Sequence, residues 1–325
     1  MIIIGKLAAI VMAAGISSRM GGFKPLLDID GKSMIRRVVD LMLASGADPV
    51  VVVTGYRAGD VEEHLADAGV LFVRNERYYQ TQMLDSLLAG ATVLPSETKR
   101  ILISPADIPL VEDGTVQALL AAKGQFVRPL CRGKAGHPVI LTRELLERLG
   151  DYSGSDGLRG AMDAYGITPV DVAVDDRGIL LDGDTREEYA ALLRRRREMT
   201  GESVRLQLDM RICLQAETVF LGPGCVQLLE LIRTTGSILQ ACECMHMSYS
   251  KGWKMIREIE QQAGFAVLTR RHGGNDGGGS ELTPEGIRFM ETYRRMCGEI
   301  WEQGRSIFQR YFPDGRPAIH EGIGS

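Results

Sequence analysis

The 325-residue chain contains 38 Lys and Arg against 42 Asp and Glu, and it is 45% hydrophobic and 25% charged. These values are typical of globular proteins, and the length predicts about two domains. A formal net charge of -4 excludes a general polycation, so binding to nucleic acid would require a local basic patch. Six cysteines are too few for a disulfide framework in a chain of this length.

The N-terminal residues are apolar, but no run reaches the roughly 18 apolar residues of a membrane span. Lys6 interrupts the run, and a glycine-rich loop with Arg19 and Lys24 follows it. This is not the pattern of a signal peptide. We therefore expect a buried first strand and a cytoplasmic protein.

Short β-branched runs alternate with helical patterns over the first 190 residues. The expected strands are Leu7–Ala13, Pro49–Thr54, Val70–Val73, Arg100–Ser104, Phe126–Pro129, Pro138–Leu141 and Val170–Val174. Between the first two strands, Ile35, Val38, Val39 and Met42 recur at helical spacing, and Gly46 ends that helix. This alternation predicts a Rossmann-like open, mostly parallel α/β sheet with helices on both faces. Ligands of such sheets bind beyond the carboxyl ends of the strands.

The alternation stops near Asp182. A charged helix, Glu187–Met199, follows and contains the arginine run Arg194–Arg197. We interpret the run as a solvated linker helix, with a nucleic-acid arm as the alternative. The expected organisation is a first domain at 1–192, a linker at 193–203, a second domain at 204–300, and a C-terminal helix end and tail at 301–325.

The second domain shows a different pattern. A short alternating segment precedes three helical patterns, a strand, a glycine-rich tip, a returning strand and a last helix, in that order. The corresponding residues are Val204–Leu214, Val226–Ile232, Ile238–Met245, a helix containing Trp253 and Ile256, Phe265–Arg270, Gly273–Gly279, Glu281–Leu282 and a helix opened by Thr283. Three helices and a β-hairpin predict a winged helix-turn-helix.

The segment Ala13–Leu27 leaves the first strand and is rich in glycine and serine. Small residues let backbone N–H groups approach and bind phosphate oxygens, and Arg19 and Lys24 supply cations for a polyanion. The spacing fits neither a Walker A loop nor a dinucleotide turn. A simple glycine turn with two surface cations is the alternative.

The spelling of this loop resembles the pattern Ala-Ala-Gly-x-Ser-x-Arg-Met-Gly-x-x-Lys, the signature of the nucleotidyltransferases that include the molybdenum cofactor cytidylyltransferases. Every fixed position is present between Ala13 and Lys24. Five further segments resemble motifs of that family, in the same order along the chain. They are Asn75–Gly90, Pro105–Val111, Gly136–Pro138, Asp156–Gly160 and Asp182–Thr185.

The resemblance implies a Mg²⁺-dependent transfer of NMP from an NTP, expected to be CMP from CTP, to the molybdopterin/molybdenum cofactor. It implies a nucleotide site made of Ala13, Ala14, Gly15, Ser17, Ser18, Gly21, Asn75, Met83 and Ser86. Catalytic roles fall on Arg19, Lys24 and Asp107, the last also as a Mg²⁺ ligand. Asp182 or Asp184 would complete the metal site. His137 and Arg159 are expected to line the substrate.

Plainer interpretations stay open. Asp107 could cap a turn, His137 could be a strand-edge residue and Arg159 could be a solvated helix residue. The chain also departs from the family pattern around the base-binding segment, at Gln82, Asp85 and Pro105. These departures weaken the expectation of CTP over another NTP.

A local basic patch lies in the second domain. The segment from Ser248 to Gly274 contains five Lys and Arg residues and only two Glu residues. The expected DNA-binding residues are Ser248, Tyr249, Ser250, Lys251, Lys254, Arg257, Arg270 and Arg271, which make phosphate and base contacts in a major groove. A small helical dimerisation domain is the alternative. Segments such as Leu221–Gly224 and Leu282–Gly286 resemble the DNA-binding domain of the molybdate-responsive regulators, ModE.

Cys242, Cys244 and His246 superficially resemble a metal cluster, but residues i and i+2 of a helix point in different directions. We interpret the cysteines as structural, with a redox sensor as the alternative. The leading hypothesis is a nucleotidyltransferase fused to a DNA-binding domain, acting as a homodimer on nucleotide, molybdopterin and double-stranded DNA. Two alternatives are a regulator whose first domain senses nucleotide or cofactor without turnover, and a transferase for sugar or alcohol phosphates.

Overall fold

The computed structural model describes residues 7–16, 23–154, 156–201, 206, 208–270 and 279–313. The chain divides into two compact units, Met1–Glu202 and Ser203–Ser325, each of which is described by itself. The predicted tail beyond Pro313 and residues 273–278 of the predicted glycine tip lie outside the described residues. Among the described residues, no helix combines the length and hydropathy needed to cross a membrane.

The first unit is built on one mixed sheet with the order β10-β7-β9-β6-β1-β4-β5. Its strands are β1 (Leu7–Ala13), β4 (Val50–Thr54), β5 (Leu71–Arg74), β6 (Arg100–Pro105), β7 (Phe126–Cys131), β9 (Val139–Thr142) and β10 (Val170–Ala173), with β8 (Lys134–Ala135) paired to β7. The pairs β1–β4, β4–β5, β1–β6 and β7–β10 are parallel, whereas β9 runs antiparallel to β6 and β7. The predicted mostly parallel sheet is confirmed.

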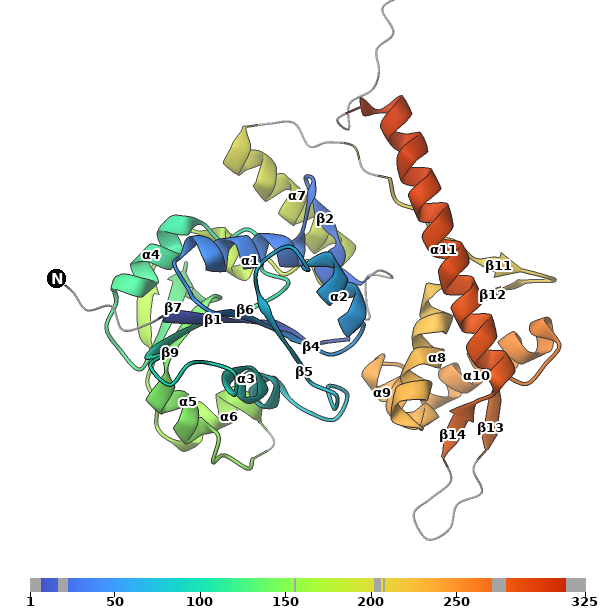
Figure 1. Ribbon diagram of the computed structural model, residues 1–325, viewed down its shortest axis with the longest axis horizontal. Helices are drawn as coiled ribbons and strands as arrows, with labels where there is room; N and C mark the ends of the chain where they lie inside the picture. Colours follow the sequence, from blue (N-terminus) through green and yellow to red (C-terminus); the bar gives the residue numbers. More distant parts are fainter. Residues whose placement is uncertain are drawn as a thin grey trace, which may run out of the picture. The chain divides into compact units, whose positions relative to one another are not determined.

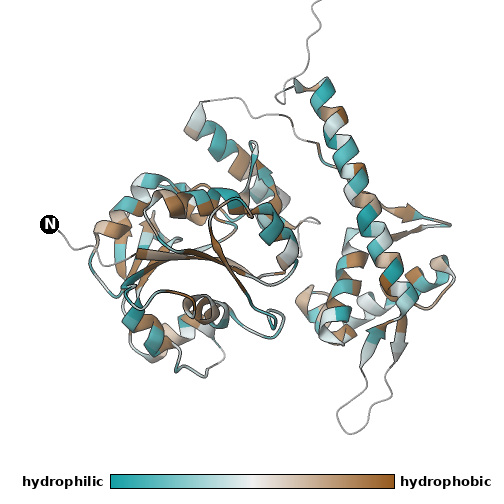
Figure 2. Cartoon of the chain, viewed as in Figure 1, coloured by the Kyte–Doolittle hydropathy of each residue, from teal (hydrophilic) through white to brown (hydrophobic). Residues whose placement is uncertain are grey.

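Helices cover both faces of this sheet (Figure 1). On one face lie α1 (Met34–Ala44), α2 (Ala58–His64) and α4 (Asp113–Ala121), and on the other lie α3 (Met83–Ala91), α5 (Arg143–Leu149) and α6 (Gly157–Ala164). The central strands are apolar throughout, as Figure 2 shows, because side chains on both faces meet helices. Ile10 and Val52, for example, have no exposed surface.

The carboxyl ends of four parallel strands meet at one edge of the sheet. Ala13 pairs with Thr54, Thr54 pairs with Arg74, and Met12 pairs with Pro105. Short elements follow at this edge: η1 (Lys24–Leu26), the hairpin β2–β3 (Asp28–Ile29 and Lys32–Ser33) and, later in the chain, η2 (Arg177–Leu180). The sheet therefore presents its ligand-binding edge to segments that are far apart in the sequence.

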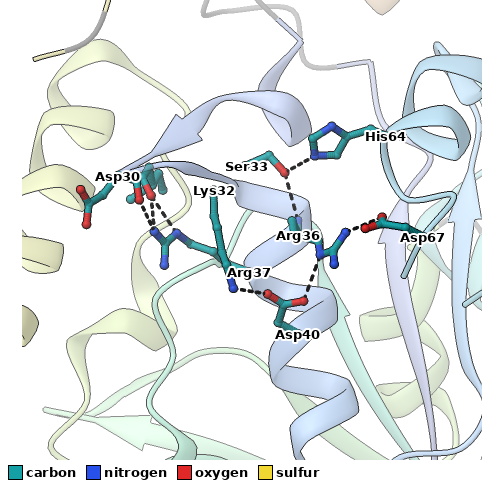
Figure 3. A network of polar contacts seen from close by, with 9 residues as sticks. Asp30, Lys32, Ser33, Arg36, Arg37, Asp40, His64 and Asp67 are labelled. Carbon is teal, nitrogen blue, oxygen red and sulfur yellow. Dashed lines mark hydrogen bonds and ion pairs between the residues drawn. The ribbon is translucent and has the colours of Figure 1, made fainter. Parts of the chain in front are cut away.

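The hairpin β2–β3 is fixed to α1 by polar contacts (Figure 3). Arg37 Nε donates to the Ile29 carbonyl at 3.0 Å, and Ser33 Oγ lies 2.7 Å from His64 Nε2 on α2. Lys32 pairs with Asp40 at 2.6 Å. The segment that follows Lys24 is thus anchored to two helices.

Helix α7 (Arg186–Thr200) belongs to the first unit and packs on the rest of it. Leu192 has no exposed surface and joins a cluster with Leu110. Arg195 pairs with Glu112, and Arg196 Nε lies 3.3 Å from Asp30. The expectation of a wholly solvated arginine run is therefore wrong for these two arginines, because acidic partners on the first unit hold them; Arg194 and Arg197 are exposed.

The second unit is a winged helix-turn-helix, as predicted. Its elements are β11 (Leu214–Gln215), β12 (Val219–Leu221), α8 (Pro223–Thr235), α9 (Ile238–Cys244), α10 (Tyr249–Ala263), β13 (Leu268–Arg270), β14 (Ser280–Leu282) and α11 (Pro284–Tyr311). Serine hydroxyls at Ser237 and Ser248 cap α9 and α10. Gly252 permits the close packing of α10 on α9, since a Cβ there would lie 2.2 Å from Cys242 Sγ.

Candidate functional site

Three residues from distant segments meet at the carboxyl edge of the sheet. Lys24, on η1, donates from Nζ to Asp107 Oδ2 at 2.7 Å and also to Asp184 Oδ1. The Lys24 side chain is 4% exposed, whereas those of Asp107 and Asp184 are 31% and 41% exposed. A buried ammonium is therefore held by two carboxylates that solutes can still reach.

Electrostatics favour the charged form of Lys24 in this cluster. Burial lowers the pKa of Lys24, but its contacts with Asp107 and Asp184 outweigh that effect, so its pKa lies above the ordinary value. Burial raises the pKa of Asp182; attraction to Lys24 opposes the rise, while repulsion from Asp184 and Asp107 adds to it. Asp184, rather than Asp182, contacts Lys24; Asp182 accepts the Asp184 N–H at 3.3 Å.

A buried aspartate positions the two acidic segments. Asp176, which is 2% exposed, accepts from the Glu112 N–H at 2.8 Å, from Thr115 Oγ1 at 2.9 Å and from the Gly178 N–H at 2.8 Å. A Cβ on Gly178 would lie 1.9 Å from the Leu110 carbonyl oxygen, so only glycine permits this approach. The turn after Asp107 is thereby held against the segment that leads to Asp184.

These positioning residues were missed by the sequence analysis. Asp176 and Gly178 stand outside every motif that suggested function, although a buried Asp two residues before a glycine is a common turn signal. Their pairing with Glu112 and Leu110 joins segments more than sixty residues apart, which no local pattern reveals.

The predicted phosphate loop is described only in part. Ala13 and Ala14 are buried at the end of β1, and a Cβ on Gly15 would meet nothing within 4 Å. The predicted residues Ser17, Ser18, Arg19 and Gly21 lie outside the described residues. Their phosphate-binding roles stay predictions.

The predicted base-binding segment is organised by its own hydrogen bonds. Asn75 Nδ2 donates to Ser86 Oγ at 2.8 Å and to Thr81 Oγ1 at 2.7 Å, and Asn75 and Ser86 are both buried. Met83 is 46% exposed. Asp85 departs from the family pattern for a local reason: it accepts the Gln82 N–H at 2.8 Å and closes a capping box at the start of α3.

His137 lies at the same edge of the sheet as Asp107. It stands two residues before Val139, which pairs with Ile103 near the carboxyl end of β6. Its Nδ1 is fully enclosed and has no partner among the described residues. Burial lowers the pKa of His137 to about 4, so the ring is neutral at physiological pH. Arg159, the other predicted substrate-lining residue, is exposed on α6.

The acidic pair fits a divalent cation. Mg²⁺ binds oxygen ligands and is commonly held by one or two carboxylates together with water and substrate phosphates. Asp107 and Asp184 already direct their oxygens at one cationic group, the Lys24 ammonium. In the described part of the chain no cluster of three or more His, Cys, Asp or Glu is arranged to bind a metal. Among the described residues, a Mg²⁺ held here would thus draw on two carboxylates, those of Asp107 and Asp184.

The predicted DNA-binding residues of α10 share an exposed surface. Tyr249, Ser250, Lys251, Lys254 and Arg257 are all exposed. The Arg257 guanidinium lies 5.5 Å from the centroid of the Trp253 ring. The Ser248 hydroxyl accepts the Lys251 N–H as the helix cap. Nothing is described of the Arg270 side chain, and Arg271 lies outside the described residues.

The cysteines of α9 have structural surroundings. Cys242 is buried against Gly252, and burial raises the pKa of the Cys242 and Cys244 thiols. A raised pKa lowers the fraction of reactive thiolate at neutral pH. This favours the structural interpretation of both residues.

Two family models match the chain, one in each unit. Residues 9–169 match the MobA-like NTP transferase domain, and residues 226–287 match the bacterial regulatory helix-turn-helix of the lysR family. The second match gives the class of DNA-binding domain but does not confirm the expected likeness to the molybdate-responsive regulators.

Known proteins similar to the first unit include a molybdenum cofactor cytidylyltransferase from Escherichia coli K12. It is 23% identical over 184 residues, which are 55% of this chain and 92% of that protein. The bifunctional protein GlmU of Listeria monocytogenes serotype 4a is 34% identical over 148 residues, 43% of this chain. The matched stretch spans only 32% of that relative.

Among solved structures, a nucleotidyl transferase from Methanothermobacter thermautotroptrophicus superposes with a TM-score of 0.54. It is 26% identical, and the match covers 60% of this chain and 99% of that one. The transferase family model ends at residue 169, inside the first unit, and the second unit has its own match. The chain thus resembles the MobA-like NTP transferase domain in its first unit and the bacterial regulatory helix-turn-helix of the lysR family in its second.

Proposed function

We propose that the first unit transfers an NMP group from an NTP to a phosphate-bearing acceptor and releases pyrophosphate. The observation that carries this proposal is the meeting of Lys24, Asp107 and Asp184 at the carboxyl edge of the sheet. Two anionic reactants must approach each other in this reaction, so the site needs cations and carboxylates that hold a metal. The cluster supplies both kinds of group.

The chain's own residues divide the work. Asp107 and Asp184 would hold Mg²⁺, which neutralises phosphate charge when bound. Lys24 and Arg19 would donate to phosphate oxygens, and the backbone of the loop after Ala13 would bind the triphosphate. The acceptor phosphate is already ionised, so no general base is required. Neutral His137 would offer a ring nitrogen to the acceptor.

We infer that the donor is CTP and the acceptor the molybdenum cofactor. Two observations support this: the loop spelling and the E. coli relative, a molybdenum cofactor cytidylyltransferase that matches along 92% of its length. The GlmU relative also matches this chain, at 34% identity over 148 residues, so the alternative of a sugar- or alcohol-phosphate acceptor is tested alongside.

We infer further that the second unit binds double-stranded DNA through α10 as part of a homodimer. The exposed cations Lys251, Lys254 and Arg257 support this, as does the helix-turn-helix match. Recognition helices of such domains enter the major groove, and dimers read two half-sites. The motif resemblance to ModE supports a regulatory role in molybdenum metabolism.

The test is pyrophosphate release with each of the four NTPs, Mg²⁺ and either molybdenum cofactor or sugar phosphates. We expect release with CTP and molybdenum cofactor, and at least a hundredfold loss in Asp107→Asn with DNA affinity unchanged. Release in Asp107→Asn at the wild-type rate would remove Asp107 from the site. Tight nucleotide binding without release under any condition would favour the sensor alternative instead.

A further inference from the structure

The Lys24 ammonium lies where the two candidate metal ligands converge. Its Nζ is 2.7 Å from Asp107 Oδ2 and also contacts Asp184 Oδ1. It has only 4% of its side-chain surface exposed, while both carboxylates are partly exposed. The lysine thus approaches the carboxylates from inside the protein and leaves their outer side to solvent.

A divalent cation cannot share these oxygens with the ammonium at low cost. Mg²⁺–oxygen distances are about 2.1 Å, so an ion on Asp107 Oδ2 would lie within about 5 Å of Lys24 Nζ. Like charges at that separation repel strongly where burial limits screening by water. Metal and ammonium therefore compete for the same pair of carboxylates.

The lysine is built to change partners without moving its backbone. The Leu27 N–H donates to the Lys24 carbonyl at 3.0 Å, and Pro25 restricts the backbone torsion angles of η1. The Phe23 ring packs edge-on against the Tyr56 ring, with 5.8 Å between the ring centroids. The four-carbon stem of a lysine is flexible. Rotation about the bonds of this stem moves the ammonium away from the carboxylates while the backbone stays in place.

We propose that Lys24 is an internal counter-ion that withholds Asp107 and Asp184 from divalent metal until a triphosphate draws the ammonium away. Metal binding to the chain is then conditional on nucleotide, and the empty enzyme discriminates against free divalent ions. This inference rests on the proposed transferase function for the identity of the polyanion. Its central claim, competition between Lys24 and metal, concerns the chain without nucleotide.

The experiment is a titration of the full chain with Mn²⁺ alone, in which the electron paramagnetic resonance signal of free Mn²⁺ reports the bound fraction. We expect weak binding by the wild-type chain and at least tenfold tighter binding by Lys24→Met. Lys24→Arg keeps the charge and should stay weak. Lys32→Met is the matched control, because Lys32 pairs with Asp40 outside the site. Adding Asp107→Asn to Lys24→Met should remove the gain.

Equal Mn²⁺ affinity of Lys24→Met and the wild-type chain would overturn the proposal. If Lys24→Met fails to fold, the melting temperature of the wild-type chain with Mn²⁺ and without nucleotide tests the proposal. A rise that Asp107→Asn abolishes would overturn the proposal. An unchanged melting temperature supports it. Because no turnover is measured, a chain inactive with every NTP still tests the competition. Conversely, an active chain whose Lys24→Met gains nothing keeps its transferase function and loses only this proposal.

Discussion

The enclosed ring nitrogen of His137 makes the folding stability of the chain depend on pH. Its Nδ1 has no partner in the part of the chain that the structure describes, and burial holds its pKa near 4 rather than 6.5. The folded chain keeps the ring neutral at pH values where the unfolded chain protonates it. The unfolded state then binds more protons, so stability must fall as the pH drops from about 6.5 toward 4.

We predict that the wild-type chain loses about 2 kcal/mol from this group between pH 7 and pH 5. His137→Gln should remove that loss, because the glutamine side chain does not titrate. Urea denaturation at the two pH values measures the difference, with His246→Asn, at an exposed histidine, as the control. Identical pH dependence in His137→Gln and the wild-type chain would show that His137 is not held neutral.

The residues of the candidate site were largely predictable, but their contacts were not. The spellings of the glycine-rich loop and of Pro105–Val111 point to Lys24 and Asp107, whereas the segment Asp182–Thr185 leaves the choice between Asp182 and Asp184 open. Among the contacts of the described residues, Asp184 rather than Asp182 hydrogen-bonds to Lys24, which supports our proposal of Asp184 as the metal ligand. That pairing spans 160 residues and depends on the packing of η2 and α7, which periodicity and motif spacing do not encode.

At the scale of elements, α7 carries two kinds of arginine in one run. Arg195 is 17% exposed and pairs with Glu112, and its Nη2 lies 3.8 Å from the buried Asp176. Arg194 is exposed. The charge run alone favoured a solvated helix because composition does not show which side of a helix meets a neighbour. The strands, in contrast, were predicted to within a few residues, since buried β-branched runs are bounded by turn residues.

We predict that Arg195→Ala destabilises the first unit by about 1–3 kcal/mol, because Asp176 and Glu112 lose their cationic partner. Arg194→Ala should change stability by less than about 0.5 kcal/mol. Urea denaturation followed by circular dichroism compares the two variants. Equal effects would mean that the run acts as a solvated surface after all.

Helix α10 should determine the salt dependence of DNA binding. Each phosphate contact releases counter-ions, so Lys254→Ala should weaken binding to any duplex and reduce the slope of log affinity against log salt by about one. Fluorescence anisotropy at several salt concentrations gives the slope. Lys123→Ala, at an exposed lysine of the first unit, should leave it unchanged. A slope unaffected by Lys254→Ala would place the DNA elsewhere.

At the scale of the whole molecule, we expect the C-terminal half of α11 to form the interface of the predicted homodimer. Ile300, Ile307 and Tyr311 are 39%, 48% and 62% exposed, and their spacing of seven and four residues places them on one face of the helix. A Cβ on Gly304, which lies on the same face, would be 2.5 Å from Met210 Cε, so Met210 packs beside this stripe. An apolar stripe of this kind is the pattern of a helix that packs on a partner helix.

We predict that the double variant Ile300→Asp, Ile307→Asp sediments as a monomer and binds a two-half-site duplex at least tenfold more weakly than the wild-type chain. Two charges buried in a helix pair are costly, whereas in a monomer they are harmless. Analytical ultracentrifugation gives the mass. Val93→Asp changes an exposed apolar residue of the first unit and should leave it unaltered. A dimer that survives the double variant would place the interface elsewhere.

The position of Asp184 has a practical consequence for dissecting the protein. The transferase family match stops at residue 169, whereas Asp184, which accepts a hydrogen bond from Lys24, comes fifteen residues later. Asp184 directly precedes Thr185, whose hydroxyl caps α7. A fragment that ends at residue 169 would lack Asp176, which positions the acidic segments. It would also lack Asp184, one carboxylate of the acidic pair, and helix α7, which follows Asp184. A fragment made to test the proposed transferase activity should therefore extend past Gly201, because a shorter fragment lacks residues of the candidate site or the helix that follows them.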